Sequence, residues 1–203
     1  MCYFYKQEQT SDTLKSYFNT TIVDGDYIQS VRYVGFAHPQ APIILNSNPK
    51  IIQPLEWGLI PFWAKDKKIQ QNTLNARIET LHEKSSFKGV IKNRCLVIAD
   101  GFFEWQWLDK EGKKKQPYIL TLQNNIPFAF AGLYSHWTDK NTGELISTFT
   151  IITTQATGIM AEIHNSKKRM PVILTKGNED YWLDGAEIQY FSSINADIQP
   201  HKL

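Results

Sequence analysis

The sequence predicts an α+β fold: a single domain, residues 1–203, of mostly antiparallel, barrel-like β-sheet flanked by a few short helices. Short apolar segments recur at intervals of roughly 8–12 residues with turn residues between them, which is typical of antiparallel β-structure. Stretches with helical periodicity are few and short. With 203 residues, 42% of them hydrophobic, the chain is long enough to bury one sizeable core.

Each predicted strand is an apolar or β-branched run bounded by turn residues. Segment 94–99 is almost entirely apolar and predicts a buried strand, which runs on to residue 107. Residues 109–115 are charged around Gly112 and predict the tip of a hairpin. The predicted strands are 27–36, 42–45, 51–57, 94–107, 117–122, 128–134, 147–154 and 170–174.

Helices are predicted where apolar residues recur every three or four positions. Ser11-Asp12 supplies an N-cap for the first of them, and 24–26 is a turn that ends it. The predicted helices are 12–22, 79–90, 156–163 and 179–183, and the tail beyond them is predicted to be irregular.

Composition narrows the class of protein. Lys and Arg number 22 and Asp and Glu 20, so the net charge is +2, and any nucleic-acid surface has to be a local patch. Cys95 lies in an apolar run and is interpreted as a buried hydrophobe, so two cysteines make no disulfide framework. No Cys/His spacing indicates a metal site, and no apolar run indicates a signal peptide or membrane span. We expect a cytoplasmic monomer that does not contact a membrane.

Met1-Cys2 is the stretch with distinctive chemistry. Removal of Met1 leaves Cys2 with a free α-amine beside its thiol, and both groups have a nucleophilic fraction at neutral pH. Such a 1,2-aminothiol captures an aldehyde twice, first as an imine and then as a five-membered thiazolidine. The alternative is that Cys2 belongs to a frayed chain end, as termini often do.

Three other positions are candidates for chemistry. Glu104 stands among aromatic residues, where desolvation would raise its pKa for acid–base work; the alternative is an ion pair with Arg77 or Arg94. His164 is either a proton shuttle or a capping histidine. Asn75 and Arg77 face the same side of an extended chain, either to orient a carbonyl and a phosphate or to stabilise a turn.

Several motifs in fixed order give the chain a family resemblance. Together with Cys2 they run to about residue 174: Trp57-Gly58-Leu59-Ile60-Pro61-Phe62-Trp63, Asn75-Ala76-Arg77-Ile78-Glu79-Thr80, Asp100-Gly101-Phe102-Phe103-Glu104-Trp105, Ala131-Gly132-Leu133-Tyr134 and Arg169-Met170-Pro171-Val172-Ile173-Leu174. In these motifs the chain resembles the SOS-response-associated peptidase (SRAP) family, the abasic-site-processing proteins.

The resemblance implies a function. Cys2 would attack the ring-opened aldehyde of an abasic site in single-stranded DNA and form a thiazolidine crosslink that shields the lesion. It also implies that Asn75 orients the Cys2 amine or the sugar, and that Glu104 and His164 handle protons. The DNA-binding residues that it implies are Arg77 and Arg169 for phosphates, Trp63 as a wedge, Thr153 for a backbone contact, and Pro39 in the loop beside the lesion. No cofactor is expected.

Three positions depart from the family pattern. Tyr3-Phe4 replaces the usual Gly-Arg, which removes an expected phosphate-binding arginine and leaves Lys6 as a candidate substitute. Residues 165–168 lengthen the spacing between His164 and Arg169. Ala64 stands where many members have a second aromatic residue.

Two other function classes remain open from the sequence. A thiol-dependent peptidase, acting on Met1 or on other peptides, would use the same Cys2. A non-covalent single-stranded DNA-binding module would rely on stacking aromatics and would show salt-reversible binding independent of Cys2.

Overall fold

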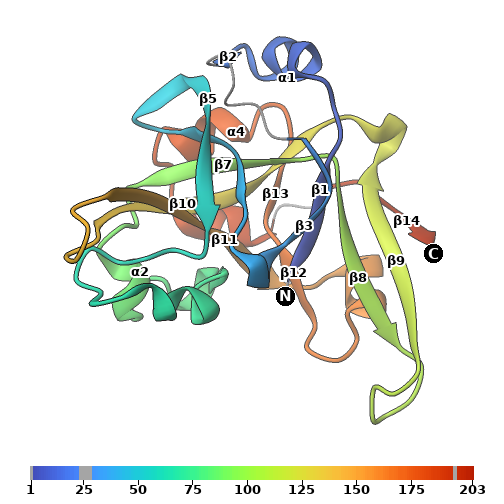
Figure 1. The fold of residues 1–203 in the computed structure, drawn as a ribbon. Coiled ribbons are helices and arrows are strands. Elements are labelled where there is room, and N and C mark those ends of the chain that lie inside the picture. Colours follow the sequence, from blue (N-terminus) through green and yellow to red (C-terminus); the bar gives the residue numbers. More distant parts are fainter. Residues whose placement is uncertain (1, 23–28, 194–195) are drawn as a thin grey trace.

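The computed structural model describes residues 2–22, 29–193 and 196–203. Met1, the turn predicted at 24–26 and the first two residues of the strand predicted at 27–36 lie outside this described part. Two sheets and several short helices make up the fold (Figure 1).

The smaller sheet contains the start of the chain. Its five strands are β1 (Phe4–Gln7), β3 (Ser30–Val34), β8 (Gly101–Trp107), β9 (Lys115–Leu122) and β14 (Ile198–Lys202). They lie in the order β14-β9-β8-β1-β3, and every neighbouring pair is antiparallel. The β8–β9 hairpin extends beyond the body of the molecule (Figure 1). The first strand of the chain is therefore held between two others.

The larger sheet has nine strands. They are β2 (Thr21–Ile22), β4 (Gln40–Leu45), β5 (Asn48–Trp57), β6 (Asn75–Arg77), β7 (Arg94–Ala99), β10 (Phe128–Thr138), β11 (Leu145–Gln155), β12 (Arg169–Pro171) and β13 (Ile173–Leu174). The main path is β12-β11-β10-β7-β4-β5-β2, and a parallel pairing of β5 with β11 closes five of these strands into a ring. This confirms the predicted α+β class with a barrel-like, mostly antiparallel sheet.

Short helices and 3-10 turns connect the strands. The α-helices are α1 (Ser11–Phe18), α2 (Ser85–Lys88), α3 (Gly158–Ile163) and α4 (Glu179–Leu183). The 3-10 turns are η1 (Gly35–Ala37), η2 (Lys67–Asn72), η3 (Ile78–Thr80), η4 (Gln123–Asn125) and η5 (Ile188–Ser193).

Several predicted elements were wrong in extent. The strand predicted at 94–107 is two strands, β7 and β8, which separate at Asp100 and belong to different sheets. The first helix ends at Phe18 because Asn19 takes a left-handed conformation and caps it. The helix predicted at 79–90 is split, since Lys84 is extended between η3 and α2. The tail predicted to be irregular contains η5 and β14, whose pairing with β9 is not visible in local periodicity.

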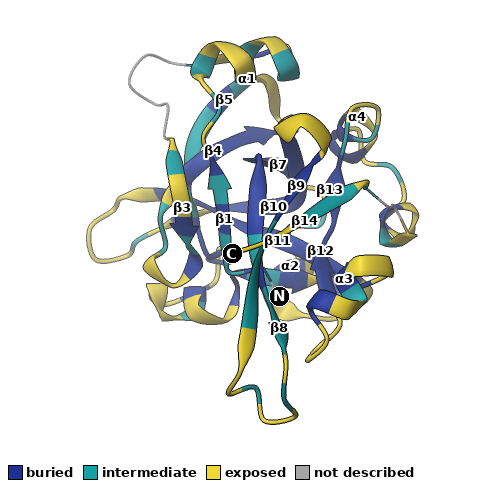
Figure 2. Cartoon of the chain, turned by 90° about the vertical axis from the view of Figure 1, so that its right-hand side faces the viewer, coloured by how far each residue is buried: buried dark blue, intermediate teal, exposed yellow. Residues whose placement is uncertain are grey.

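Apolar side chains form a core on each side of the larger sheet. One core joins the two sheets and contains Tyr5, Phe102 and Phe130, and the other packs the opposite face against the helices through Leu14 and Trp182. The residues of β7 alternate between the two cores, so this strand is buried throughout (Figure 2). The buried strand predicted at 94–99, with Cys95 in it, is confirmed.

Candidate active site

Cys2 lies fully buried two residues before β1 rather than at a frayed end. β1 pairs with β8 through Tyr5 opposite Phe102. On its other side, the Gly35 amide, just after β3, donates to the Tyr3 carbonyl and extends the β1–β3 pairing toward Cys2. The thiol lies 3.8 Å from the carbonyl oxygen of Phe4. Burial, reinforced by the nearby charge of Glu104, raises the pKa of the Cys2 thiol well above its ordinary value.

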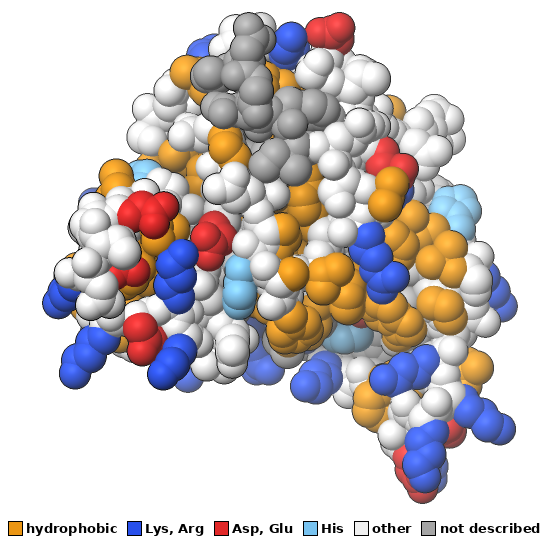
Figure 3. All heavy atoms as spheres, in the orientation of Figure 1, with side chains coloured by type: hydrophobic (Ala, Val, Ile, Leu, Met, Phe, Trp, Pro, Cys, Tyr) orange, Lys and Arg blue, Asp and Glu red, His pale blue; other side chains and the backbone are white. Residues whose placement is uncertain are grey.

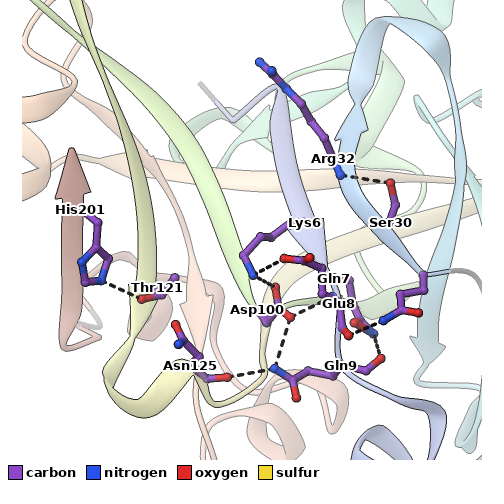
Figure 4. A network of polar contacts seen from close by, with 11 residues as sticks. Lys6, Gln7, Glu8, Gln9, Ser30, Arg32, Asp100, Thr121, Asn125 and His201 are labelled. Carbon is purple, nitrogen blue, oxygen red and sulfur yellow. Dashed lines mark hydrogen bonds and ion pairs between the residues drawn. The ribbon is translucent and has the colours of Figure 1, made fainter. Parts of the chain in front are cut away.

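A polar network fixes the other end of β1 (Figure 4). The buried carboxylate of Asp100 accepts the Glu8 amide at 2.8 Å and pairs with Lys6 Nζ at 3.0 Å. The Gln9 side-chain amide donates to Asp100 and to the Asn125 carbonyl. Lys6 also pairs with Glu8 at 2.6 Å, so its ammonium group is engaged inside the protein. It does not replace a free phosphate-binding arginine in this structure.

Asn75 holds the backbone of Cys2. Its side-chain Nδ2 donates to the Cys2 carbonyl at 2.9 Å. Asn75 begins β6, which pairs in parallel with β11, and the buried Trp57 indole donates to the carbonyl of Leu74 just before it. The sequence motifs around Trp57 and Asn75 thus meet in space, and the Asn75 amide that they position faces the backbone of Cys2.

Glu104 and His164 form a buried acid–base pair beside Cys2. Glu104 comes from the middle of β8, and His164 caps the C-terminal end of α3. Oε2 of Glu104 lies 3.8 Å from Nε2 of His164. Because Arg94 instead binds the carbonyls of Trp182 and Ala186, the structure does not pair it with Glu104.

Burial moves the two pKa values in opposite directions. It raises the pKa of Glu104 to about 7, and, together with the positive charges of Lys167 and Arg169, it lowers the pKa of His164 to about 4. Between these values Glu104 carries a proton that it can donate, while His164 is neutral and can accept one.

The backbone of Arg169 orients the imidazole of His164. Nδ1 lies 2.7 Å from the Arg169 carbonyl oxygen and 3.0 Å from its amide nitrogen. The ring either donates to the carbonyl or accepts from the amide, and the tautomer decides whether Nε2 carries its proton toward Glu104. The four residues between His164 and Arg169 therefore do not displace His164 from Glu104, since the Lys168 amide donates back to the His164 carbonyl.

Arg169 and Thr153 are buried and bonded to other parts of the protein. The Arg169 guanidinium binds both oxygens of Glu79, at 2.7 and 2.9 Å, and donates to the Thr153 carbonyl at 2.8 Å. Burial opposes ionisation of Glu79, but the Arg169 hydrogen bonds outweigh it and keep the pKa of Glu79 below its ordinary value. Glu79 was present in the Asn75-to-Thr80 motif, but its place as the partner of Arg169 was not predicted.

Arg77, Trp63 and Pro39 lie nearer the surface. Arg77 ends β6 with an exposed side chain. Trp63 is 45% exposed in the loop after β5, which confirms a loop that displays large side chains, and Pro39 is half-buried. The two loops touch, because His38 Nδ1 lies 2.8 Å from the Trp57 carbonyl. Ala64 is buried and its carbonyl accepts the Trp137 indole, so this departure from the family pattern serves the core.

A pocket of about 220 Å³ opens beside the acid–base pair. Aromatic side chains line it together with Glu104, His164 and two lysines. The lining residues are Tyr3, Phe4, Glu104, Trp105, Trp107, Lys115, His164, Ser166 and Lys167. Its aromatic residues and lysines were not predicted as site residues, although Tyr3-Phe4 was recognised as a departure from the family.

Two further searches cover only the described residues. Over 2–22, 29–193 and 196–203, no group of His, Cys, Asp and Glu side chains is arranged to hold a metal ion. Within the same ranges, no helix is long and apolar enough to cross a membrane.

Comparison with known proteins identifies the family. The family described as SOS response associated peptidase (SRAP) matches residues 1–201. The abasic site processing protein YoqW of Bacillus subtilis (strain 168) is 44% identical over 162 residues, 78% of this chain and 68% of YoqW. The abasic site processing protein HMCES of Gallus gallus is 35% identical over 168 residues, 70% of this chain and 48% of HMCES.

A solved structure agrees with the match. A crystal structure of a protein from Bacteroides thetaiotaomicron has a TM-score of 0.84 to this fold at 32% identity, covering 100% of this chain and 92% of that one. Sequence match and fold therefore agree over almost the whole chain, and the chain belongs to the SOS response associated peptidase (SRAP) family.

Proposed function

We propose that this protein processes abasic sites in single-stranded DNA by capturing their aldehyde on Cys2 after Met1 is removed. One observation carries the proposal: Cys2 is held by Asn75 beside a buried carboxyl–imidazole pair. The names of YoqW and HMCES as abasic site processing proteins support the same substrate. An abasic nucleotide has no base to unstack, so the lesion can enter the site without base flipping.

The chemistry proceeds in two steps. The Cys2 amine adds to the aldehyde carbon, and loss of the resulting hydroxyl as water gives an imine. The thiol then adds to the imine carbon and its proton moves to the nitrogen, which closes the thiazolidine. Because burial raises the pKa of the Cys2 thiol, little thiolate is present beforehand, so the amine reacts first.

Glu104 and His164 supply the proton transfers. A protonated Glu104 donates to the departing hydroxyl, and neutral His164 accepts a proton from the amine or the thiol. Asn75 keeps the Cys2 backbone in place, so that both nucleophiles approach the same carbon.

The proposed DNA contacts divide into two groups. Arg77 would bind a phosphate, Trp63 would wedge beside the lesion, and the Pro39 loop would flank it, since all three are at least partly accessible. Arg169 would have to leave Glu79 to bind a phosphate, and Thr153 is fully buried. We therefore propose that these two residues are positioning residues. The Arg169 backbone orients His164, and Thr153 pairs with β6.

A crosslinking assay tests the proposal. Purified protein is mixed with an oligonucleotide containing one abasic site and separated on a denaturing gel. Wild type should give a heat-stable shifted band, Cys2→Ala should abolish it, and the matched variant Cys95→Ala should retain it because that thiol lies in the core. Absence of the band in wild type would overturn the proposal.

Self-removal of Met1 is a second candidate activity, supported by the burial of Cys2. A folded chain cannot offer Cys2 to an external aminopeptidase while its carbonyl is bound to Asn75. Intact mass tests this activity: a Glu104→Gln chain that keeps Met1, beside a wild type that loses it, would support it. Equal loss from both chains would exclude a role for Glu104.

A further inference from the structure

The outer face of the five-stranded sheet carries aromatic side chains that face away from the core. In β8, Phe102 and Glu104 are buried, whereas the alternating residues Phe103 and Trp105 are only half-buried. In β1, Tyr5 is buried and Phe4 is half-buried. Since neighbouring side chains of a strand point to opposite faces, the half-buried rings share the outer face.

These rings form one cluster with an arginine on it. Phe4 and Trp105 meet edge to face with centroids 5.1 Å apart. The guanidinium of Arg32, an exposed residue of β3, lies 4.7 Å from the Phe4 ring, 5.2 Å from Phe103 and 5.9 Å from Trp105. Among the described residues, no carboxylate lies within ion-pair distance of Arg32.

The cluster continues along β8 toward the hairpin. The Lys115 ammonium lies 5.5 Å from the ring of Trp107, repeating the pairing of a cation with an aromatic ring. Figure 3 shows hydrophobic side chains gathered over β1, β3 and β8, with Lys and Arg side chains among them. We define Phe4, Arg32, Phe103, Trp105 and Trp107 as the aromatic platform.

The platform is continuous with the candidate active site. Phe4, Trp105 and Trp107 line the same pocket as Glu104 and His164. Lys115 and Lys167 also line this pocket, so positive charge lies on both the sheet and the loop after His164. A polymer that enters the site at Glu104 and leaves through this pocket would pass onto the platform.

We propose that the aromatic platform binds unpaired bases of the single strand next to the abasic site. The inference rests on the proposed function for its substrate. Partly exposed rings on a sheet stack with any base, and interleaved cations accompany the phosphates without reading sequence. Arg32 places a guanidinium over the Phe4 ring, so a cation and an aromatic face lie together on the platform.

Binding of an oligonucleotide without an abasic site tests the platform separately from crosslinking. Fluorescence anisotropy with a labelled oligothymidine measures Kd for wild type, Trp105→Leu and Arg32→Gln. We expect each variant to weaken binding about tenfold, which corresponds to about 1.4 kcal/mol. Arg32 is exposed, so Arg32→Gln should fold normally. The test therefore remains decisive even if Trp105→Leu does not fold.

Matched controls lie on other elements. Tyr181→Leu removes a 60% exposed ring on α4, and Lys176→Gln breaks a cation–π contact with Tyr17; both should bind as wild type does. Unchanged Kd values in both platform variants would overturn the inference, as would equal weakening in the controls. The two proposals can fail separately. If wild type does not crosslink abasic DNA but Arg32→Gln weakens oligothymidine binding, the proposed function is refuted and the platform is supported.

Discussion

Glu104 and His164 show how one buried position can hold an acid and a base at the same pH. The two groups lie 3.8 Å apart, and burial favours the neutral form of each. A carboxyl group that keeps its proton and an imidazole that has lost its proton are the states that imine formation uses. Desolvation thus shifts the pKa values of both residues in opposite directions.

The pH dependence of stability should reveal the raised pKa of Glu104. From its ordinary value near ~4.3 up to about 7, the folded chain retains a proton that the unfolded chain has released, so Glu104 lowers the free energy of unfolding as pH rises. His164 acts oppositely between about 4 and its ordinary value near ~6.5, since there the unfolded chain binds the extra proton.

Replacing Glu104 with Gln should remove the decrease in the free energy of unfolding that Glu104 causes as pH rises, and leave the opposite effect of His164. The free energy of unfolding of Glu104→Gln, relative to that of wild type, should rise by roughly 2 kcal/mol between about pH 5 and about pH 7.5. Urea unfolding at each pH measures this difference. The exposed Glu162→Gln on α3 serves as the control and should run parallel to wild type. Parallel curves for Glu104→Gln would refute the raised pKa.

At the scale of elements, the Arg169–Glu79 ion pair joins β12 to η3. The Arg169 side chain is 8% exposed and that of Glu79 is 45% exposed, so one partner is buried and the other is partly solvated. The backbone carbonyl and amide of Arg169 also hold the His164 imidazole. This pair therefore connects the stability of β12 to the geometry of the acid–base pair.

Arg169→Ala should lower the free energy of unfolding by about 3 kcal/mol, because Glu79 loses its partner and the Thr153 carbonyl loses a donor. Lys15→Ala breaks the exposed ion pair with Asp12 and should change the free energy of unfolding by less than about 0.5 kcal/mol. Urea denaturation measures both. A loss in Arg169→Ala as small as that of Lys15→Ala would favour a loosely held arginine that is available to phosphate.

Local sequence predicted the elements whose signal is local. The strand at 94–99 follows from its apolar run, and the hairpin tip from its charged residues around Gly112. β14 was missed because it depends on β9, far earlier in the chain. The first helix ended early because Asn19 adopts a left-handed conformation, a choice that apolar periodicity does not encode.

The candidate site was predictable in composition but not in geometry. The ordered motifs identified Cys2, Asn75, Glu104 and His164, and the structure brings them together. Their roles stay predictions. The internal pairing of Arg169 and the platform around Arg32 could not be predicted, because both depend on side chains from separate strands meeting in space.

At the scale of the whole molecule, charge is nearly balanced, with a net value of +2. Attraction to DNA must therefore come from a few local cations rather than from the overall field. Each phosphate contact to a single strand contributes about −0.7 to the slope of log K against log salt. We expect a slope between about −2 and −3 for an oligonucleotide without an abasic site.

Arg77→Gln should flatten that slope by about 0.7, because it removes one exposed cation on β6. Lys50→Gln, an exposed residue of β5 that lines a different pocket, should leave the slope unchanged. Anisotropy titrations at several salt concentrations provide the measurement. Identical slopes for Arg77→Gln and wild type would remove Arg77 from the proposed phosphate contacts.

The hydrogen bond from Asn75 to Cys2 spans 73 residues, and this separation sets an order of events during synthesis. Cys2 leaves the ribosome before Asn75, Glu104 and His164 have been synthesised. Until β6, β8 and α3 have formed, Cys2 lacks its hydrogen bond from Asn75 and the neighbouring pair of Glu104 and His164. Completion of the fold therefore takes Cys2 out of solvent and places it beside the carboxyl–imidazole pair.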